Sequence, residues 1–191
     1  MIKEIYIDVD DVLNNFFPDL MDELGIPPEL FPFDPSLGFD LFSHVNKHLP
    51  GRWHSAAEFW DSIPGDWWRH ISKSDLCDRL VQACFDMVGP ENVYVATSPT
   101  KCSQSMAAKH EWIRDNLPEP LHRQFFITPR KWCLGKPGAL LIDDNQDNTA
   151  RFCTRGGEVI LRPRPWNCQH RLTSNSDDIV MLLLQVLNAT R

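Results

Sequence analysis

The 191-residue sequence lacks any dense block of lysine and arginine, and its formal net charge at pH 7 is −7. An acidic chain without a basic patch is repelled by nucleic-acid backbones and by anionic membrane surfaces. No window reaches about eighteen uninterrupted apolar residues, the length that a transmembrane helix needs. No basic segment followed by an apolar run opens the chain. We therefore expect a soluble cytoplasmic protein that binds neither polynucleotides nor membranes.

The sequence also lacks closely spaced cysteine pairs. The six cysteines include no CxxC pair, whereas zinc sites and disulfide frameworks usually show closely spaced cysteines. We therefore expect reduced cysteines in an intracellular protein. Repeats and low-complexity tracts are absent as well, and the length suits one core domain that carries a small insertion.

What the sequence does contain is a set of short β-rich runs. They are near-continuous apolar stretches, which is typical of strands buried on both faces of a sheet. They lie at residues 2–10, 92–98, 124–128, 139–144 and 158–163.

Helical patterns separate or follow these runs at residues 72–89, 103–118 and 176–187. In the second of them, Met106, Ile113 and Leu117 are expected on one buried side. The alternation of strands and helices predicts an α/β fold with a doubly wound parallel sheet.

Residues 14–73 break this alternation and are rich in proline, phenylalanine and tryptophan. Such a segment is too long for an ordinary connection between a strand and a helix. We predict a small, mainly helical insertion here, with residues 1–13 and 74–191 forming the core domain. Most of its aromatic side chains are expected to form its own core, although their number is also compatible with a homodimer contact.

Polar clusters follow three of the predicted strands. Ligands of an open parallel sheet bind beyond the carboxyl ends of its strands, so these clusters should share one crevice. Crowded carboxylates repel one another unless a cation neutralises them, and an all-oxygen set suits Mg²⁺. The clusters are Asp8, Asp10 and Asp11 after the first strand, Thr97 and Ser98 after the second, and Asp143 and Asp144 after the fourth.

Two lysines, Lys131 and Lys136, lie between the third and fourth strands. A lysine beside carboxylates, hydroxyls and Mg²⁺ supplies the positive charge that the oxygens of a transferring phosphoryl group need. The spacing therefore predicts phosphoryl transfer. A receiver-type phosphorylation domain uses similar parts, but it has a lone aspartate before the Thr or Ser, and no acidic pair after the lysine.

The order DVDDV, VATSP, a lysine and LLIDD resembles the four motifs of the haloacid dehalogenase superfamily of phosphohydrolases. The phrases TSPTK, KHEWI, ITPRK, FWDS and GGEVILRPRPWN resemble the 5'(3')-deoxyribonucleotidases within it. The likeness runs from residue 5 to about 168 and is poor between residues 18 and 55. It implies a Rossmann-like core with a helical cap inserted after the first strand.

The same resemblance implies a Mg²⁺-dependent phosphomonoesterase, a hydrolase that removes phosphate from deoxynucleoside monophosphates through an aspartyl-phosphate intermediate. One alternative is a phosphatase of this type for another small ester, such as a sugar phosphate or a nucleic-acid end. A second is a non-catalytic, receiver-like module that binds phosphate.

Individual roles follow from the resemblance. Asp8 would attack phosphorus, and Asp10 would protonate the leaving hydroxyl and then assist water. Mg²⁺ would be bound by Asp8, Asp10 through its carbonyl, Asp143 and Asp144. The phosphate would be bound by Thr97, Ser98 and Lys131, with Lys136 as the alternative lysine.

The positions that match base-stacking aromatics of the cap are Phe16 and Trp60, with Trp67 or Trp68 completing the wall. Stacking alone does not select one base. One residue departs from the family pattern: Asp11 stands where glycine is common. We expect its side chain to point to solvent or to serve at a helix start, rather than to face the metal.

Overall fold

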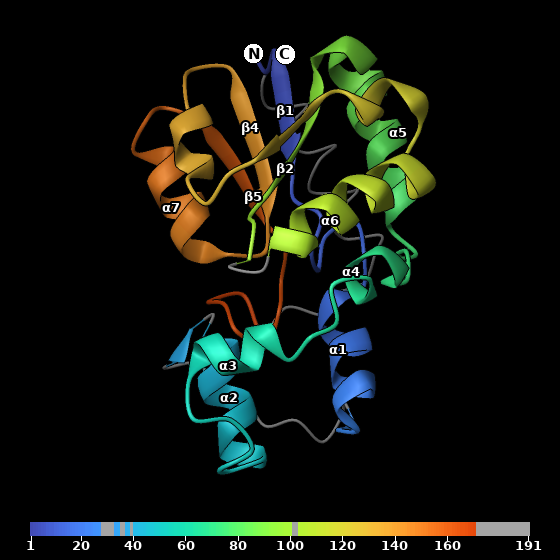
Figure 1. Ribbon diagram of the computed structural model, residues 1–191. Helices are drawn as coiled ribbons and strands as arrows, with labels where there is room; N and C mark the ends of the chain where they lie inside the picture. Colours follow the sequence, from blue (N-terminus) through green and yellow to red (C-terminus); the bar gives the residue numbers. More distant parts are fainter. Residues whose placement is uncertain (28–32, 35–36, 39, 101–102, 171–191) are drawn as a thin grey trace.

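The computed structural model describes residues 1–27, 33–34, 37–38, 40–100 and 103–170 (Figure 1). Its centre is a five-stranded parallel sheet in the order β3-β2-β1-β4-β5. The strands are β1 (Glu4–Ile7), β2 (Val93–Thr97), β3 (Phe125–Ile127), β4 (Ala139–Asp143) and β5 (Glu158–Leu161). The predicted α/β class and all five predicted strands are confirmed.

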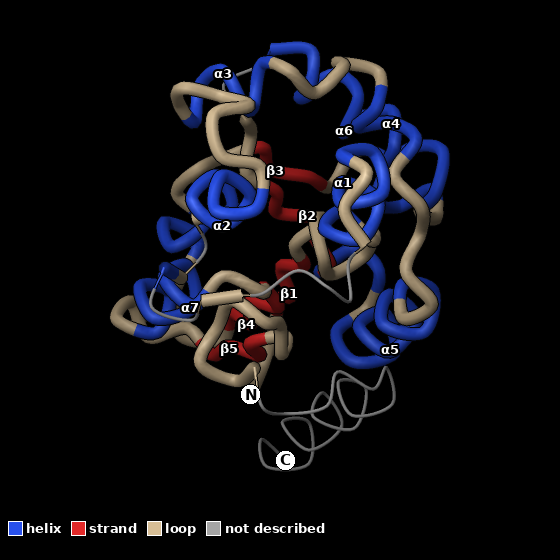
Figure 2. The backbone as a smooth tube through the Cα atoms, turned by 90° about the horizontal axis from the view of Figure 1, so that it is seen from below, coloured by secondary structure: helices blue, strands red, loops and turns tan. Residues whose placement is uncertain are grey.

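Helices cover both faces of this sheet. α5 (Cys77–Val88) and α6 (Ser103–Asn116) lie on one face, and α7 (Gln146–Cys153) lies on the other (Figures 1 and 2). Short 3-10 helices lie in the connections at Pro90–Asn92, Glu119–His122 and Lys131–Leu134. The winding direction reverses between β1 and β4, which is where such sheets bind ligands beyond the strand ends.

Helix α7 was not predicted, because it is short and mostly polar. It forms because the Asn145 side chain accepts hydrogen bonds from the backbone N–H groups of Asp147 and Asn148, and it buries Phe152 against the sheet. The predicted helix at 176–187 lies outside the described residues.

The buried side of α6 differs in part from the prediction. Ile113 and Leu117 are buried, but Met106 is 39% exposed. The inner face of the helix is centred on Lys109 and Trp112, both buried, so Met106 lies at its margin.

Between β1 and α5, the described residues form four α-helices: α1 (Phe16–Leu24), α2 (Leu41–His48), α3 (Ala56–Asp61) and α4 (Trp67–His70). The first three lie beyond the carboxyl end of the sheet, below it in Figure 1, and α4 packs against α6. The chain enters and leaves this region side by side, because Asn14 and Lys73 form an antiparallel bridge. The division into a core and a cap at residues 14 and 73 stays a prediction.

None of the helices within the described ranges combines the length and the apolar content needed to cross a bilayer. Five of the six cysteines lie in these ranges, and each of them is a free thiol.

Replacing Leu140 by alanine should lower the free energy of unfolding by about 2–5 kcal/mol, because it leaves a cavity in the central strand β4, where Leu140 is fully buried. Truncating Met106 to alanine should change that free energy by less than about 0.5 kcal/mol, because the side chain lies at the surface. Chemical denaturation measures both values. If Met106→Ala lowered the free energy of unfolding as much as Leu140→Ala does, Met106 would not lie at the surface of α6.

Candidate functional site

The carboxyl ends of β1 and β4 bring three acidic side chains together. The two strands pair in parallel, and the Asp8 N–H donates to the Ile142 carbonyl at 2.9 Å. Asp8, Asp143 and Asp144 are buried, and each offers a carboxylate oxygen within 4.8 Å of the others. Asp10, the fourth predicted metal ligand, is not part of this carboxylate cluster.

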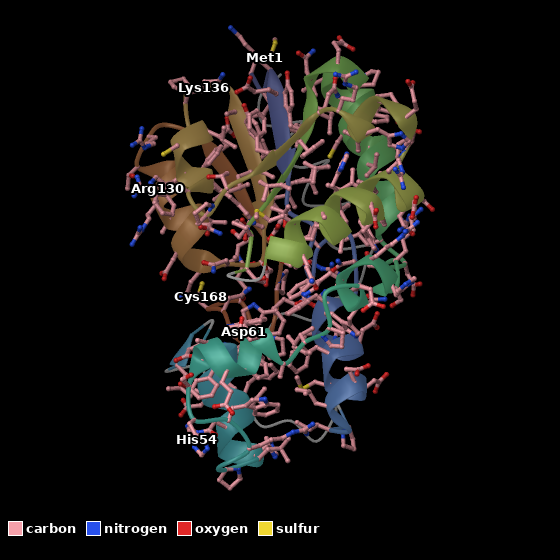
Figure 3. All side chains as sticks on the ribbon, in the orientation of Figure 1. Met1, His54, Asp61, Arg130, Lys136 and Cys168 are labelled. Atoms are coloured by element: carbon pink, nitrogen blue, oxygen red, sulfur yellow. The ribbon has the colours of Figure 1, made fainter. Side chains whose placement is uncertain are left out.

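Lys131 lies between two of these acids. Its Nζ is 2.6 Å from Asp8 Oδ2 and 2.9 Å from Asp143 Oδ2, and its side chain is 1% exposed. Lys136 is 59% exposed and pairs with Glu4 at 2.8 Å. Figure 3 shows Lys136 at the amino end of the sheet, on the side of Met1. Of the two candidate lysines, Lys131 is therefore the one that contacts the acids.

One lysine does not neutralise three buried carboxylates. Burial raises the pKa of Asp8 to about 7, although Lys131 opposes the shift. Burial and repulsion from Asp143 and Asp8 raise the pKa of Asp144 well above its ordinary value. Burial by itself would lower the pKa of Lys131, but Asp143 and Asp8 outweigh it and raise that pKa. A divalent cation among these acids would offset the repulsion, so the donor set fits Mg²⁺.

A second buried lysine, Lys109 on α6, completes the site and was missed in the sequence. Its Nζ donates to Asp10 Oδ2, to the Ser98 carbonyl at 2.9 Å and to Thr97 Oγ1 at 3.4 Å. A charged residue within a helix is usually assigned to the solvent side. Lys109, however, lies three residues before the buried Trp112, and this spacing puts it on the apolar face of α6. The spacing is the sequence signal that could have identified Lys109.

The remaining polar residues lie close by. Thr97 ends β2 and is fully buried, with its hydroxyl toward Lys109. Ser98 follows it and lines the cavity described next. Asp10 also accepts a hydrogen bond on Oδ1 from Asn14 Nδ2, at 3.2 Å. The Asp10 carboxylate is therefore held by Lys109 on one oxygen and by Asn14 on the other.

A cavity of about 360 Å³ opens over these groups and is lined by both lysines and by Asp8, Asp10 and Asp144. Aromatic residues form part of its wall. The Phe16 ring stacks on Trp60 and Trp68, with ring centroids 6.3 and 5.3 Å apart. Trp67 packs edge-on against Phe16 and Trp68 and is not among the lining residues. The structure brings Phe16 and Trp60 to the cavity, with Trp68 rather than Trp67 beside them.

No protein-family model and no curated protein matches the chain. Several solved structures are similar to it in fold. A HAD family hydrolase from Deinococcus radiodurans R1, crystallised with bound phosphate and sodium, is 14% identical with a TM-score of 0.57, over 97% of each chain. A haloacid dehalogenase-like protein of unknown function from Agrobacterium tumefaciens is 14% identical with a TM-score of 0.55, over 100% of this chain and 99% of that one.

A HAD-superfamily hydrolase of subfamily IA from Geobacter sulfurreducens is 12% identical with a TM-score of 0.51, over 95% of this chain and 96% of that one. This chain has the haloacid dehalogenase-like fold. At such identities the likeness concerns the fold, so the chemistry has to be argued from the site.

Within this haloacid dehalogenase-like fold, Asp11 is buried and does not point to solvent. It adopts a φ of 54°, and its Oδ1 accepts a hydrogen bond from the Phe17 N–H at 3.0 Å, in the first turn of α1. Of the two expected roles, the helix-start role is therefore the one observed. Burial raises the pKa of Asp11 to about 6, while the nearby Arg164 opposes the shift. The sequence could not reveal this burial, because Arg164 lies far away along the chain.

Mg²⁺ should raise the thermal stability of the protein, by about 2.7 kcal/mol at a hundredfold excess over its dissociation constant. Asp144→Asn should stabilise the metal-free protein, because an ionised Asp144 is repelled by Asp143 and Asp8, and it should reduce the effect of Mg²⁺. Calorimetry with Mg²⁺ and with chelator measures both quantities.

The matched control is Asp147→Asn, which changes an exposed acid on α7 and should leave the Mg²⁺ effect unchanged. Equal Mg²⁺ responses in wild type and Asp144→Asn would exclude Asp144 from the cation site.

Proposed function

We propose that this protein is a Mg²⁺-dependent phosphomonoesterase that hydrolyses deoxynucleoside monophosphates. The observation that carries the proposal is the meeting of Asp8, Asp10, Lys109 and Lys131 in one cavity of about 360 Å³ with an aromatic wall. This volume lies within the range of small-molecule sites, about 300–1,000 Å³. The similarly folded Deinococcus hydrolase was crystallised with phosphate, which agrees with a phosphatase.

Asp8, Asp143 and Asp144 would hold Mg²⁺, with the backbone carbonyl of Asp10. When bound, the metal supplies positive charge that offsets the charge of these acids and of the phosphate oxygens. The raised pKa values of Asp8 and Asp144 support this assignment, because an ionised nucleophile at this buried position needs more positive charge than Lys131 provides.

In the first step, a carboxylate oxygen of Asp8 attacks phosphorus and the bond from phosphorus to the leaving oxygen breaks. Asp10 gives a proton to that oxygen, so the alcohol leaves neutral. Asp8 is held for the attack by the Val9 N–H, which donates to Oδ1 at 2.7 Å, and by Lys131 at Oδ2. Asp10 is oriented by Lys109 and Asn14.

In the second step, water attacks phosphorus and gives a proton to Asp10 while the bond from phosphorus to Asp8 breaks. Inorganic phosphate leaves and Asp8 is restored. Throughout, Lys131, Thr97 and Ser98 bind the non-reacting phosphate oxygens, and Lys109 adds a second positive charge next to them.

The aromatic wall suits the nucleoside part of the substrate. Phe16, Trp60 and Trp68 offer ring surfaces for a base, and stacking on aromatic side chains tolerates any base. Trp67 supports this wall from behind, through its contacts with Phe16 and Trp68. Helices α1 to α3 cover the site and exclude water that competes with the attack of Asp8.

Phosphate release from deoxynucleoside and ribonucleoside 5'- and 3'-monophosphates, sugar phosphates and an aryl phosphate tests this proposal. Wild type should release phosphate best from deoxynucleoside monophosphates, with Mg²⁺ and not with chelator. Asp8→Asn should lower kcat by about a thousandfold or more, because it removes the nucleophile. Lys131→Ala should lower it by about a hundredfold, because a charge beside the phosphoryl oxygens is lost.

Lys136→Ala is the matched control, since it removes an exposed lysine and should keep wild-type kcat. No release by wild type from any of these esters overturns the proposal. Release from sugar phosphates alone would keep the chemistry and remove the nucleotide substrate.

Trp60→Ala should raise KM for deoxynucleoside monophosphates by about tenfold, because one stacked base contributes about 1–3 kcal/mol. Its kcat/KM for acetyl phosphate, which has no ring to stack, should stay near the wild-type value. Steady-state kinetics measures kcat and KM for both substrates. An equal loss of kcat/KM on both would show that Trp60 does not contact a base.

A further inference from the structure

The six residues from Arg162 to Asn167 follow β5 and contact both loops that carry the acids. We propose that this segment, the 162–167 brace, positions the cation site, and that Trp166 sets its affinity for a divalent cation. This inference rests on the proposed function in one respect, because it requires a cation at these acids. It does not depend on which phosphate ester the protein hydrolyses.

The first contact of the brace is with Asp144. Trp166 is buried, and its Nε1 donates to Asp144 Oδ2 at 2.7 Å. Asn167 Nδ2 donates to the Asp144 carbonyl at 2.9 Å and to the Arg162 carbonyl at 2.7 Å. The backbone and the side chain of Asp144 are therefore both fixed, and an N–H on Oδ2 sets the direction in which Oδ1 points.

The second contact is with the turn that follows Asp10. Arg162 Nη1 donates to the carbonyls of Asp11 and Val12, at 2.6 and 2.7 Å. Arg164 donates to the Asp11 carbonyl from Nε at 3.1 Å and from Nη2 at 2.7 Å. The Arg162 N–H also donates to the Asp143 carbonyl at 2.9 Å. One segment thus connects the turn after β1 to the loop after β4.

The brace acts through other residues rather than on the substrate. Arg162, Arg164 and Trp166 are not among the residues that line the 360 Å³ cavity. Their polar groups point to the backbone of the Asp11 turn and to Asp144. They are therefore positioning residues, and groups that hydrogen-bond to metal ligands typically change metal affinity by about 10–100-fold when removed.

Trp166→Phe should weaken Mn²⁺ binding by about tenfold or more, because Asp144 loses the N–H that orients it. Electron paramagnetic resonance of free Mn²⁺ measures this without reference to activity. The Mg²⁺ concentration for half-maximal phosphate release should rise by a similar factor, while kcat at saturating Mg²⁺ stays within about twofold of wild type.

The matched control is Trp53→Phe. Trp53 is also buried, and its Nε1 donates to Ser62 Oγ at 3.0 Å, away from the acids. This variant should bind Mn²⁺ as wild type does. Where thermal unfolding shows that Trp166→Phe does not fold, 3-benzothienylalanine at position 166, with sulfur in place of the indole N–H, provides the same test in the same shape.

Arg164→Lys tests the other contact, since it keeps the charge and removes the paired donors on the Asp11 carbonyl. It should lower kcat by roughly ten- to a hundredfold, because Asp10 loses its fixed position. It should weaken Mn²⁺ binding less than Trp166→Phe does, because the Asp10 carbonyl is one of several proposed metal ligands, and wild-type kcat in the folded variant contradicts this second contact. Arg52→Lys is its control: Arg52 is exposed, and its Nη1 also donates to a backbone carbonyl, that of Leu24 at 3.3 Å, away from the cavity. This variant should keep wild-type kcat.

Wild-type Mn²⁺ affinity in the folded Trp166→Phe or benzothienylalanine protein overturns the inference, as does a wild-type protein that binds no Mn²⁺. Weaker Mn²⁺ binding in a protein that releases phosphate from no ester keeps the inference and overturns only the proposed function.

Discussion

The pairing of β1 with β4 determines the site, because it makes Asp8 and Asp143 leave the sheet as neighbours. Buried carboxylates at this separation repel one another, and the surrounding groups counteract the repulsion. Lys131 lies between Asp8 and Asp143. Asp143 accepts hydrogen bonds from the Asn145 N–H at 2.8 Å and from Asn148 Nδ2 at 3.3 Å. The excess of negative charge that remains favours a divalent cation at this position.

The aromatic wall of the cavity is built from two parts with different supports. Trp68 belongs to α4, which is fixed to α6 because Trp112 Nε1 donates to the Ile71 carbonyl at 2.7 Å and Arg69 pairs with Asp115. Phe16 and Trp60 lie on α1 and α3, beyond the end of the sheet. Lys109 connects the acidic groups to the aromatic wall. Its Nζ contacts Asp10 and lies 4.9 Å from the centroid of the Trp68 ring. Asp10, the proposed proton donor, is thus tied to the part of the wall that is fixed to the core.

The sequence predicted those features that depend on local patterns. Buried strands are continuous apolar runs, and parallel strands bring the residues at their carboxyl ends together, so the sheet and the acidic cluster could both be foreseen. The choice between Lys131 and Lys136 depends on the course of the loop around the 3-10 helix at Lys131–Leu134, which spacing does not encode. Lys109 was missed because its partners come from other elements. For Asp11, the helix-start role is local and was one of the two expected roles, but its burial depends on Arg162, 151 residues away along the chain.

Asp11 shows how the brace and helix α1 are connected. A non-glycine residue in the left-handed region costs roughly 1–2 kcal/mol of backbone energy, and glycine would adopt a φ of 54° without that cost. Glycine would, however, offer no carboxylate to the Phe17 N–H at the start of α1. The Phe17 ring in turn packs on Trp166, with centroids 5.4 Å apart. Because Trp166 holds Asp144, a displacement of α1 acts on the cation site through two routes, the Asp11 turn and the Trp166 indole.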